Sequence, residues 1–190
     1  KHCGCQYQDP VQEAQSHESF AWTCAQVTPA TRDFLAALPF RLDLLPLGGH
    51  MAGPRAVLVH GTPTLNTVYW TADRSDDFCR QMARIAQLRA GDAIAFGHTH
   101  VPWHREVDGV HFLNTGSVGR PKDGDSRAGY VLLDAGDGEP HVEFVRVTYD
   151  IERAMDGIRQ SGLPHAFADY LRSGGKPLVY VPKSPTLPAS

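Results

Sequence analysis

A chain of 190 residues, of which 42% are hydrophobic and 21% are charged, has the size and composition of one globular domain with a buried core. The formal net charge of -3 gives no basic field, so neither nucleic acid nor an anionic membrane is indicated as a partner. No apolar run approaches the roughly 18 residues of a membrane span, and the first residues lack the apolar core of a signal peptide. We therefore expect a cytoplasmic protein.

Four cysteines are too few and too scattered for the disulfide framework of a small secreted domain. Reduced thiols are therefore expected. Cys3 and Cys5 do not have the C-x2-C spacing of a common zinc site.

The first third of the chain predicts helix from Ser16 to Leu38. Thr28 is suited to be an N-cap, and Pro29 follows at the first helical position. The apolar face that we expect in the core carries Phe34, Leu35 and Leu38.

Two short apolar runs predict strands that are buried on both faces. Residues 56–59 lead directly into His60, and residues 93–96 lead into Gly97-His98-Thr99-His100. With a helix between them, these strands predict a βαβ unit whose ligand site lies at the carboxyl ends of the strands.

The intervening helix should begin at Ser75, where acidic residues follow a capping side chain. Phe78, Met82 and Ile85 recur at positions i, i+4 and i+7, which predicts a buried face. Gly91 is the expected end of this helix.

Antiparallel hairpins are predicted in the second half of the chain. One covers residues 104–114 around Asp108-Gly109, a pair suited to positive φ, and the other joins residues 128–133 to residues 141–148. Asp150 should then cap a helix that ends at Gly162, and a short helix should pass through Tyr170.

The three histidines after the predicted strands point to a metal site. Alternate residues on an extended backbone point the same way, so His98 and His100 could bind one ion or two adjacent ions, and His60 should enter the same crevice. Imidazole suits Zn, Mn, Fe or Ni better than Ca or Mg. The alternative is that all three are ordinary polar loop residues.

The segment Leu113–Asp125, taken together with Gly97–Pro102, resembles the calcineurin-like metallophosphoesterase family, and its YfcE-like bacterial members in particular. The resemblance implies a four-layer α/β/β/α sandwich over residues 1–175, followed by a proline-rich tail over residues 176–190. It also implies that His60 and His98 share one divalent transition-metal ion and that His100 binds a second. Manganese is the first choice of metal, with Fe, Zn or Ni as alternatives.

The resemblance further implies that a metal-bound hydroxide hydrolyses small phosphodiesters or phosphomonoesters. Asn114, Arg120 and Arg127, with Lys122 nearby, are the candidates for substrate binding because arginine suits phosphate geometry. The alternative for the cations is that they are solvated loop charges. The protein could also form a homo-oligomer.

The family's Asp-x-His, Gly-Asp and Gly-Asn motifs do not occur in this chain. We therefore expect about 60 or more further residues upstream of Lys1, which would carry the bridging aspartate and the proton donor. The full-length protein should be the enzyme, and this chain alone should be inactive. Two alternatives are a catalytically incomplete binding scaffold and a mononuclear three-histidine zinc hydrolase.

Overall fold

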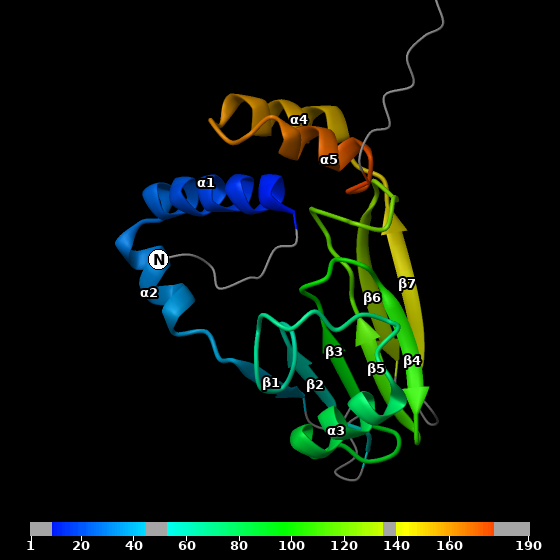
Figure 1. Ribbon diagram of the computed structural model, residues 1–190. Coiled ribbons are helices and arrows are strands. Elements are labelled where there is room, and N and C mark those ends of the chain that lie inside the picture. Colours follow the sequence, from blue (N-terminus) through cyan, green and yellow to red (C-terminus); the bar gives the residue numbers. More distant parts are fainter. Residues whose placement is uncertain (1–8, 45–52, 135–139, 177–190) are drawn as a thin grey trace, which may run out of the picture.

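The computed structural model describes residues 9–44, 53–134 and 140–176 (Figure 1). The Cys3-Cys5 segment and the proline-rich tail from residue 177 onward lie outside this range. The described helices are α1 (Pro10–Gln26), α2 (Pro29–Ala36), α3 (Asp76–Ala86), α4 (Ile151–Gln160) and α5 (Ala166–Arg172). The strands are β1 (Arg41–Leu44), β2 (Ala56–Val59), β3 (Ala93–Phe96), β4 (Trp103–Val107), β5 (Val110–Asn114), β6 (Ala128–Asp134) and β7 (His141–Val147).

A five-stranded sheet in the order β1-β2-β3-β5-β4 forms the centre of the molecule. Strands β2, β3 and β5 are parallel, whereas β1 and β4 are antiparallel edge strands. The predicted βαβ unit is confirmed, with α3 as the connection between β2 and β3. The carboxyl ends of β2 and β3 therefore meet at one edge of the sheet.

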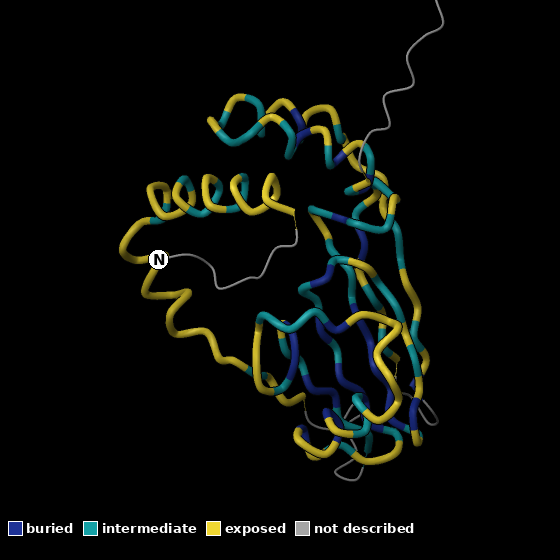
Figure 2. Tube along the Cα trace, viewed as in Figure 1, coloured by how far each residue is buried: buried dark blue, intermediate teal, exposed yellow. Residues whose placement is uncertain are grey.

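The core lies between this sheet and α3, where Figure 2 shows the strands as the most buried part of the chain. Apolar side chains from β2, β3 and β5 are fully enclosed because these strands have neighbours on both sides. Trp70 is completely buried and stacks on Phe96, with ring centroids 4.2 Å apart and planes inclined by 7°. This contact fastens the segment after β2 to the end of β3.

Both predicted hairpins are present. Asp108 and Gly109 join β4 to β5 with φ angles of 51° and 76°, as a two-residue turn with left-handed backbone requires. Strands β6 and β7 form a separate antiparallel sheet. Asp150 caps α4 by accepting a hydrogen bond from the backbone N–H of Arg153 at 3.0 Å, and α5 follows as the predicted short helix.

The predicted end of α3 is wrong. The helix stops at Ala86, because Gln87 adopts left-handed backbone with φ of 58°. Gly91 instead donates its N–H to the carbonyl of Gly109 at 2.7 Å. The buried face also differs, since Ile85 is 41% exposed while Cys79 and Ala86 are buried.

The expected core face near the front of the chain is also wrong. Helix formation breaks between α1 and α2, where Thr28 caps α2 as predicted by accepting from the N–H of Thr31 at 3.2 Å. Neither helix contains a buried residue. The predicted core side chains are instead 51 to 65% exposed: Phe34, Leu35 and Leu38.

The architecture is a mixed α/β fold in which helices flank a central sheet and a second sheet lies beside it (Figure 1). This agrees with the predicted fold class. Strand β1, which was not predicted, extends the sheet by pairing with β2, and two of its side chains, Leu42 and Leu44, are exposed. Among the described residues, none of the helices has both the length and the apolar character needed to cross a bilayer.

Candidate metal centre

His60 and His98 come together at the carboxyl ends of β2 and β3. The parallel pairing continues past the strands, since Gly97 donates its N–H to the carbonyl of His60 at 3.0 Å. The Nε2 atom of His60 then lies 3.1 Å from Nδ1 of His98, with the two rings edge to face and their centroids 5.1 Å apart. The sheet itself therefore juxtaposes two imidazoles that are 38 residues apart in the sequence.

The backbone that carries His98 and His100 is left-handed, with a φ of 62° at each residue. The extended backbone assumed from the sequence is therefore wrong. Thr99 donates its N–H to the carbonyl of Gly97 at 2.7 Å, which closes a tight turn with His98 at its centre. Left-handed backbone at residues other than glycine costs about 1 to 3 kcal/mol each and gathers at functional sites. The backbone conformation of this loop is therefore consistent with a candidate site.

Asn114 holds the loop in this conformation. Its side-chain NH2 donates to the carbonyl of Gly97 at 2.9 Å and to Oγ1 of Thr99 at 2.8 Å, while its side-chain oxygen accepts from the N–H of Gly116 at 3.0 Å. Asn114 is completely buried, so it supports the histidine loop from behind and does not face solvent. Asn114 was a candidate for substrate binding in the sequence analysis. In the structure its side chain bonds to the two loops and so positions the histidines.

His100 is oriented by a backbone carbonyl. Its Nδ1 lies 2.7 Å from the carbonyl oxygen of Arg120, and because a carbonyl can only accept, Nδ1 must carry the proton. The Nε2 of a neutral ring then has a free electron pair, which is the state that metal-binding histidines adopt. Lys122 reinforces the contact by donating its backbone N–H to the carbonyl of His100 at 3.2 Å.

The environment favours neutral imidazoles. Burial lowers the pKa of His98, and the charges of His60 and His100 lower it further. Burial also lowers the pKa of His100, assisted by the positive charges of Lys122 and Arg120, while the hydrogen bond to the Arg120 carbonyl opposes the shift. A neutral ring is the form that binds a metal ion.

The segment that follows His60 contributes an aromatic side chain, Tyr69, that was not predicted as part of the candidate site. The ring of Tyr69 lies against that of His98, with centroids 4.6 Å apart, and the neighbouring Trp70 anchors the segment in the core. The sequence feature that could have predicted this contact is the aromatic pair Tyr69-Trp70, which follows the histidine at the end of β2. Tyr69 thereby limits the orientations open to the imidazole of His98.

The candidate substrate-binding cations occupy different surroundings. The carboxylate of Asp125 forms an ion pair with Arg127 at 2.7 Å, whereas the guanidinium of Arg120 lies over the ring of Phe167, 4.8 Å from its centroid. The structure thus brings Arg120 and Lys122 beside His100 and ties Arg127 to its neighbour along the chain.

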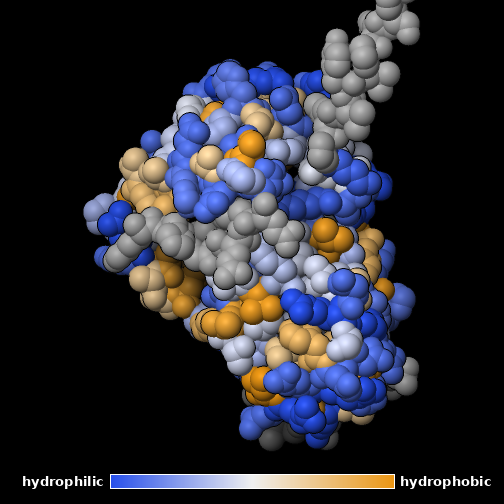
Figure 3. Space-filling model, viewed as in Figure 1, coloured by the Kyte–Doolittle hydropathy of each residue, from blue (hydrophilic) through white to orange (hydrophobic). Residues whose placement is uncertain are grey.

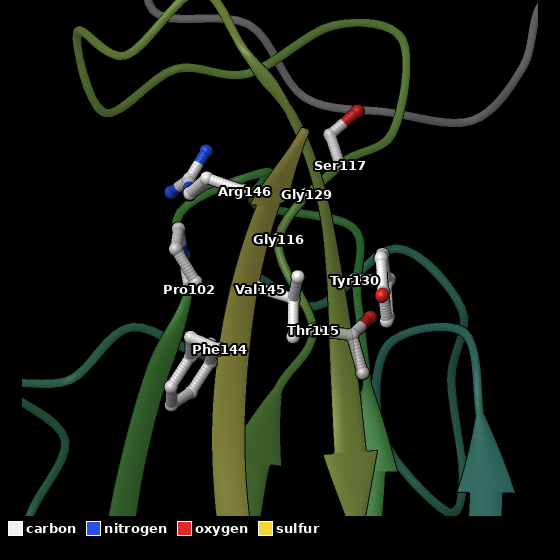
Figure 4. Close-up of a pocket in the computed structure, with 9 residues that line it drawn as sticks. All are labelled: Pro102, Thr115, Gly116, Ser117, Gly129, Tyr130, Phe144, Val145 and Arg146. Atoms are coloured by element: carbon white, nitrogen blue, oxygen red, sulfur yellow. The ribbon is translucent and has the colours of Figure 1, made fainter. Parts of the chain in front are cut away.

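A hollow of about 180 Å³ lies between the Thr115–Ser117 loop and the strands β6 and β7 (Figure 4). Its lining includes Pro102, Tyr130 and Phe144, and none of the three histidines. It therefore separates the two sheets locally and is not the candidate site.

The fit of metal ions depends on which nitrogens are available. Nδ1 of His98 faces Nε2 of His60 at about the separation of two ligand atoms that each lie roughly 2.1 Å from one ion. If Nδ1 of His98 bound an ion, its buried Nε2 would carry the ring proton, and a hydrogen bond with the backbone of Thr67 raises the pKa of this histidine against the lowering by burial. The residues present thus fit a metal ion.

Three ligands on one ion are not found, since no cluster of three or more His, Cys, Asp or Glu side chains within residues 9–44, 53–134 and 140–176 could hold a metal. This geometry gives no support to the mononuclear three-histidine alternative. His60 and His98 lie at a separation that one ion could span, and the ring of His100 is oriented separately by the Arg120 carbonyl.

The profile of the calcineurin-like phosphoesterase superfamily domain matches residues 33–138, which is more than half of the chain. The chain therefore belongs to the calcineurin-like phosphoesterase superfamily.

This chain is also similar in sequence to a longer archaeal protein. An uncharacterized protein of Methanocaldococcus jannaschii is 27% identical, and the match covers 80% of this chain and 63% of that protein. This chain thus spans less than two thirds of that relative's length.

Two crystal structures share the fold. A metallophosphoesterase from Sphaerobacter thermophilus is 24% identical, with a TM-score of 0.66 over 89% of this chain and 71% of the other. A hypothetical protein from Pyrococcus horikoshii is 20% identical, with a TM-score of 0.70 over 90% and 63% of the two chains.

Proposed function

We propose that this chain supplies three histidine ligands to a metal-dependent phosphoesterase that binds two divalent transition-metal ions and hydrolyses small phosphate esters. The observation that supports the proposal most directly is the 3.1 Å approach of His60 Nε2 to His98 Nδ1 at the ends of adjacent parallel strands. Membership of the phosphoesterase superfamily supports the reaction class.

The roles of the residues follow from their surroundings. His60 and His98 would hold one ion, and His100, with its Nδ1 proton fixed by the Arg120 carbonyl, would hold the other. When bound, such ions supply Lewis acidity towards a phosphoryl oxygen and a nucleophile at neutral pH. Asn114 keeps the loop in place, and Tyr69 restricts the ring of His98.

The remaining parts of the site are expected from sequence outside this chain. Two neighbouring cations repel each other and require a bridging carboxylate and further oxygen ligands, and the leaving group requires a proton donor. None of the described carboxylates joins the histidines in a metal-binding cluster. We propose that the full-length protein provides these groups, that manganese is the preferred metal, and that phosphodiesters are preferred to monoesters.

Metal titration of the full-length protein tests the proposal. We expect two Mn²⁺ ions per chain, and we expect His60→Ala and His98→Ala each to weaken the binding of at least one ion by more than roughly tenfold, since each removes a direct ligand. His141→Ala, which removes an exposed histidine of β7, is the matched control. Hydrolysis of bis(p-nitrophenyl) phosphate and of p-nitrophenyl phosphate should be measured on the same samples.

The result also separates the alternatives. One ion per chain would favour a mononuclear hydrolase. Absence of both metal binding and hydrolysis would favour a binding scaffold. Unchanged Mn²⁺ affinity in both histidine variants would contradict the proposed ligands.

A further inference from the structure

Arg120 is held beside His100 by contacts at three points. Its backbone N–H donates to Oγ of Ser117 at 2.9 Å, and its carbonyl accepts from Nδ1 of His100 at 2.7 Å. Its guanidinium carbon lies 4.8 Å from the ring centroid of Phe167 on α5. Backbone and side chain are thus both fixed, so the position of the charge is defined relative to the histidine.

Other arginines around this loop are neutralised by carboxylates. Arg127 pairs with Asp125 at 2.7 Å, and Arg146 pairs with Asp123. In the described part of the chain, no carboxylate forms an ion pair with Arg120. The guanidinium carbon lies over the ring of Phe167, and the N–H groups that do not face this ring remain for an acceptor. Arg120 therefore retains its capacity to bind an anion.

The surroundings of His100 are positively charged. Arg120 and Lys122 both bond to this residue through their backbones, since the carbonyl of Arg120 accepts from Nδ1 of His100 at 2.7 Å and the N–H of Lys122 donates to the His100 carbonyl at 3.2 Å. Arginine binds phosphoryl oxygens through two parallel N–H donors, and such charge-assisted bonds are about twice as strong as neutral ones. An anion that approaches the histidines would meet these charges.

The C-terminal helices fasten the loop that carries these cations. Besides the contact of Phe167 with Arg120, Gly124 donates its N–H to the carbonyl of Gly174 at 2.9 Å, just beyond α5. The backbones approach so closely that a Cβ added at Gly175 would lie 2.4 Å from the carbonyl oxygen of Pro121. The helical pair α4–α5 therefore reaches the candidate site through α5 and the turn after it.

We propose that Arg120, oriented by Phe167, binds a phosphoryl oxygen of the substrate, so that the C-terminal helical pair takes part in substrate recognition. This proposal rests on the proposed function, which identifies the anion as a phosphate ester. It assigns Phe167 as a positioning residue that acts through Arg120.

Binding of inorganic phosphate to the Mn²⁺-loaded full-length protein, followed by isothermal titration calorimetry, tests the role of Arg120. Arg120→Gln should weaken phosphate binding about tenfold or more, because it removes charge-assisted hydrogen bonds. Arg120→Lys should retain part of the affinity, since it keeps the charge and loses the paired donors. Arg153→Gln, which removes an exposed arginine of α4, is the matched control.

Substitution of Phe167 tests the positioning role. Phe167→Leu should weaken phosphate binding about two- to fivefold through loss of the cation–π contact, and Phe167→Tyr should restore it. Mn²⁺ affinity and the melting temperature should stay the same in Phe167→Leu. A purely structural role would change stability and would leave phosphate affinity unchanged, which would overturn the assignment of Phe167.

The outcomes separate this proposal from the proposed function. Phosphate affinity that is equal in Arg120→Gln and the unsubstituted protein, while Mn²⁺ binding and hydrolysis are intact, would overturn only the role of Arg120. Failure of the unsubstituted protein to bind Mn²⁺ would overturn the proposed function, and the phosphate titration without metal would still decide Arg120. Absence of phosphate binding to the unsubstituted protein under both conditions would overturn the proposal made here.

Discussion

Asn114 links the core to the candidate site through a single buried amide. Both ends of the side chain are hydrogen-bonded, as a group with no exposed surface requires. The bonds reach Gly97, Thr99 and Gly116, which lie on two different loops. Removal of the amide would take away the side-chain acceptor of the Gly116 N–H, and the Gly97 carbonyl and the Thr99 hydroxyl would each lose one of their hydrogen bonds.

We therefore expect Asn114→Ala to lower the free energy of unfolding by about 1 to 3 kcal/mol and to weaken Mn²⁺ binding. Urea denaturation and metal titration measure the two effects. Asn66→Ala, which removes an exposed asparagine of the neighbouring loop, should change neither quantity by much. Wild-type metal affinity in Asn114→Ala would show that the loop keeps its shape without the amide.

A second histidine pair lies on the β4–β5 hairpin, away from the candidate metal ligands. His104 Nε2 and His111 Nδ1 are 3.1 Å apart, and the rings stack with centroids 5.3 Å apart. Burial and the charge of His111 lower the pKa of His104 below its ordinary value of 6.5, and Glu106 partly opposes them. The unfolded chain then takes up this proton at higher pH than the folded protein does.

The free energy of unfolding should therefore fall as the pH drops below about 6.5, because protonation of His104 favours the unfolded state. His104→Gln should make this decline shallower between about pH 7 and pH 5. Urea denaturation at several pH values measures the slope, with His141→Gln as the matched control at an exposed histidine. If stability changed with pH equally in the unsubstituted protein, His104→Gln and His141→Gln, the contribution assigned to His104 would be contradicted.

The segment between β2 and α3 behaves as one structural element because both of its ends are anchored. Near the start, Thr62 is 1% exposed and bonds in both directions with Leu65, whose N–H donates to the Thr62 hydroxyl at 3.0 Å. Towards its end, Trp70 is buried in the core. A Cβ at Gly61 would lie 2.7 Å from the carbonyl oxygen of Asn66, so the turn closes directly over that glycine.

Gly61→Ala should push this turn outward and move the ring of Tyr69 relative to that of His98. We expect a loss of about 1 to 3 kcal/mol in stability, which is typical of overpacking, together with weaker Mn²⁺ binding. Thermal unfolding and metal titration are the measurements. Gly157→Ala is the matched control, because nothing lies within 4 Å of a Cβ added there, on the exposed side of α4. Equal effects of the two substitutions would rule out the steric explanation.

The elements that could be predicted were those with a strong local signal. The apolar runs before His60 and His98 gave the parallel strands, and Asp108-Gly109 gave the hairpin, since only a left-handed pair suits that turn. The end of α3 could not be predicted, because Gln87 adopts a left-handed conformation that its residue type does not favour. Strand β1 was missed because its pairing with β2 is a tertiary contact.

The approach of His60 to His98 could be predicted from the sequence, whereas the backbone conformation of the histidine loop could not. Placing histidines after neighbouring parallel strands was enough to bring His60 and His98 together. The left-handed turn at His98 depends on hydrogen bonds from Asn114, which lies 16 positions farther along the chain by residue number. Contacts of that kind carry no pattern that can be recognised in the local sequence.

In the whole molecule, the side chains around the central sheet are well packed, whereas the side chains of α1 and α2 are largely exposed. Figure 3 shows hydrophobic surface over α2 and the stretch that leads to β1. Trp22 of α1 donates its indole N–H to the carbonyl of Ser161 at 2.7 Å, which ties the front of the chain to the C-terminal helices. Exposed apolar surface of this kind marks an interaction face or a tendency to aggregate.

We expect the 190-residue chain, expressed by itself, to self-associate through this surface. Sedimentation velocity over a range of concentrations measures the association. The double substitution Phe34→Ser with Leu38→Ser should reduce it, whereas Ile85→Ser, at an exposed apolar position on α3, should not. A concentration-independent monomer would contradict this expectation.

The left-handed turn at His98 and His100 limits which side chains could take their places. Asparagine, aspartate and glycine accept such backbone readily, whereas valine and isoleucine do not. An aspartate exchanged for either histidine would keep the loop shape while replacing a nitrogen donor by a harder oxygen donor. The metal preference of the proposed site could therefore be altered by design without rebuilding its scaffold.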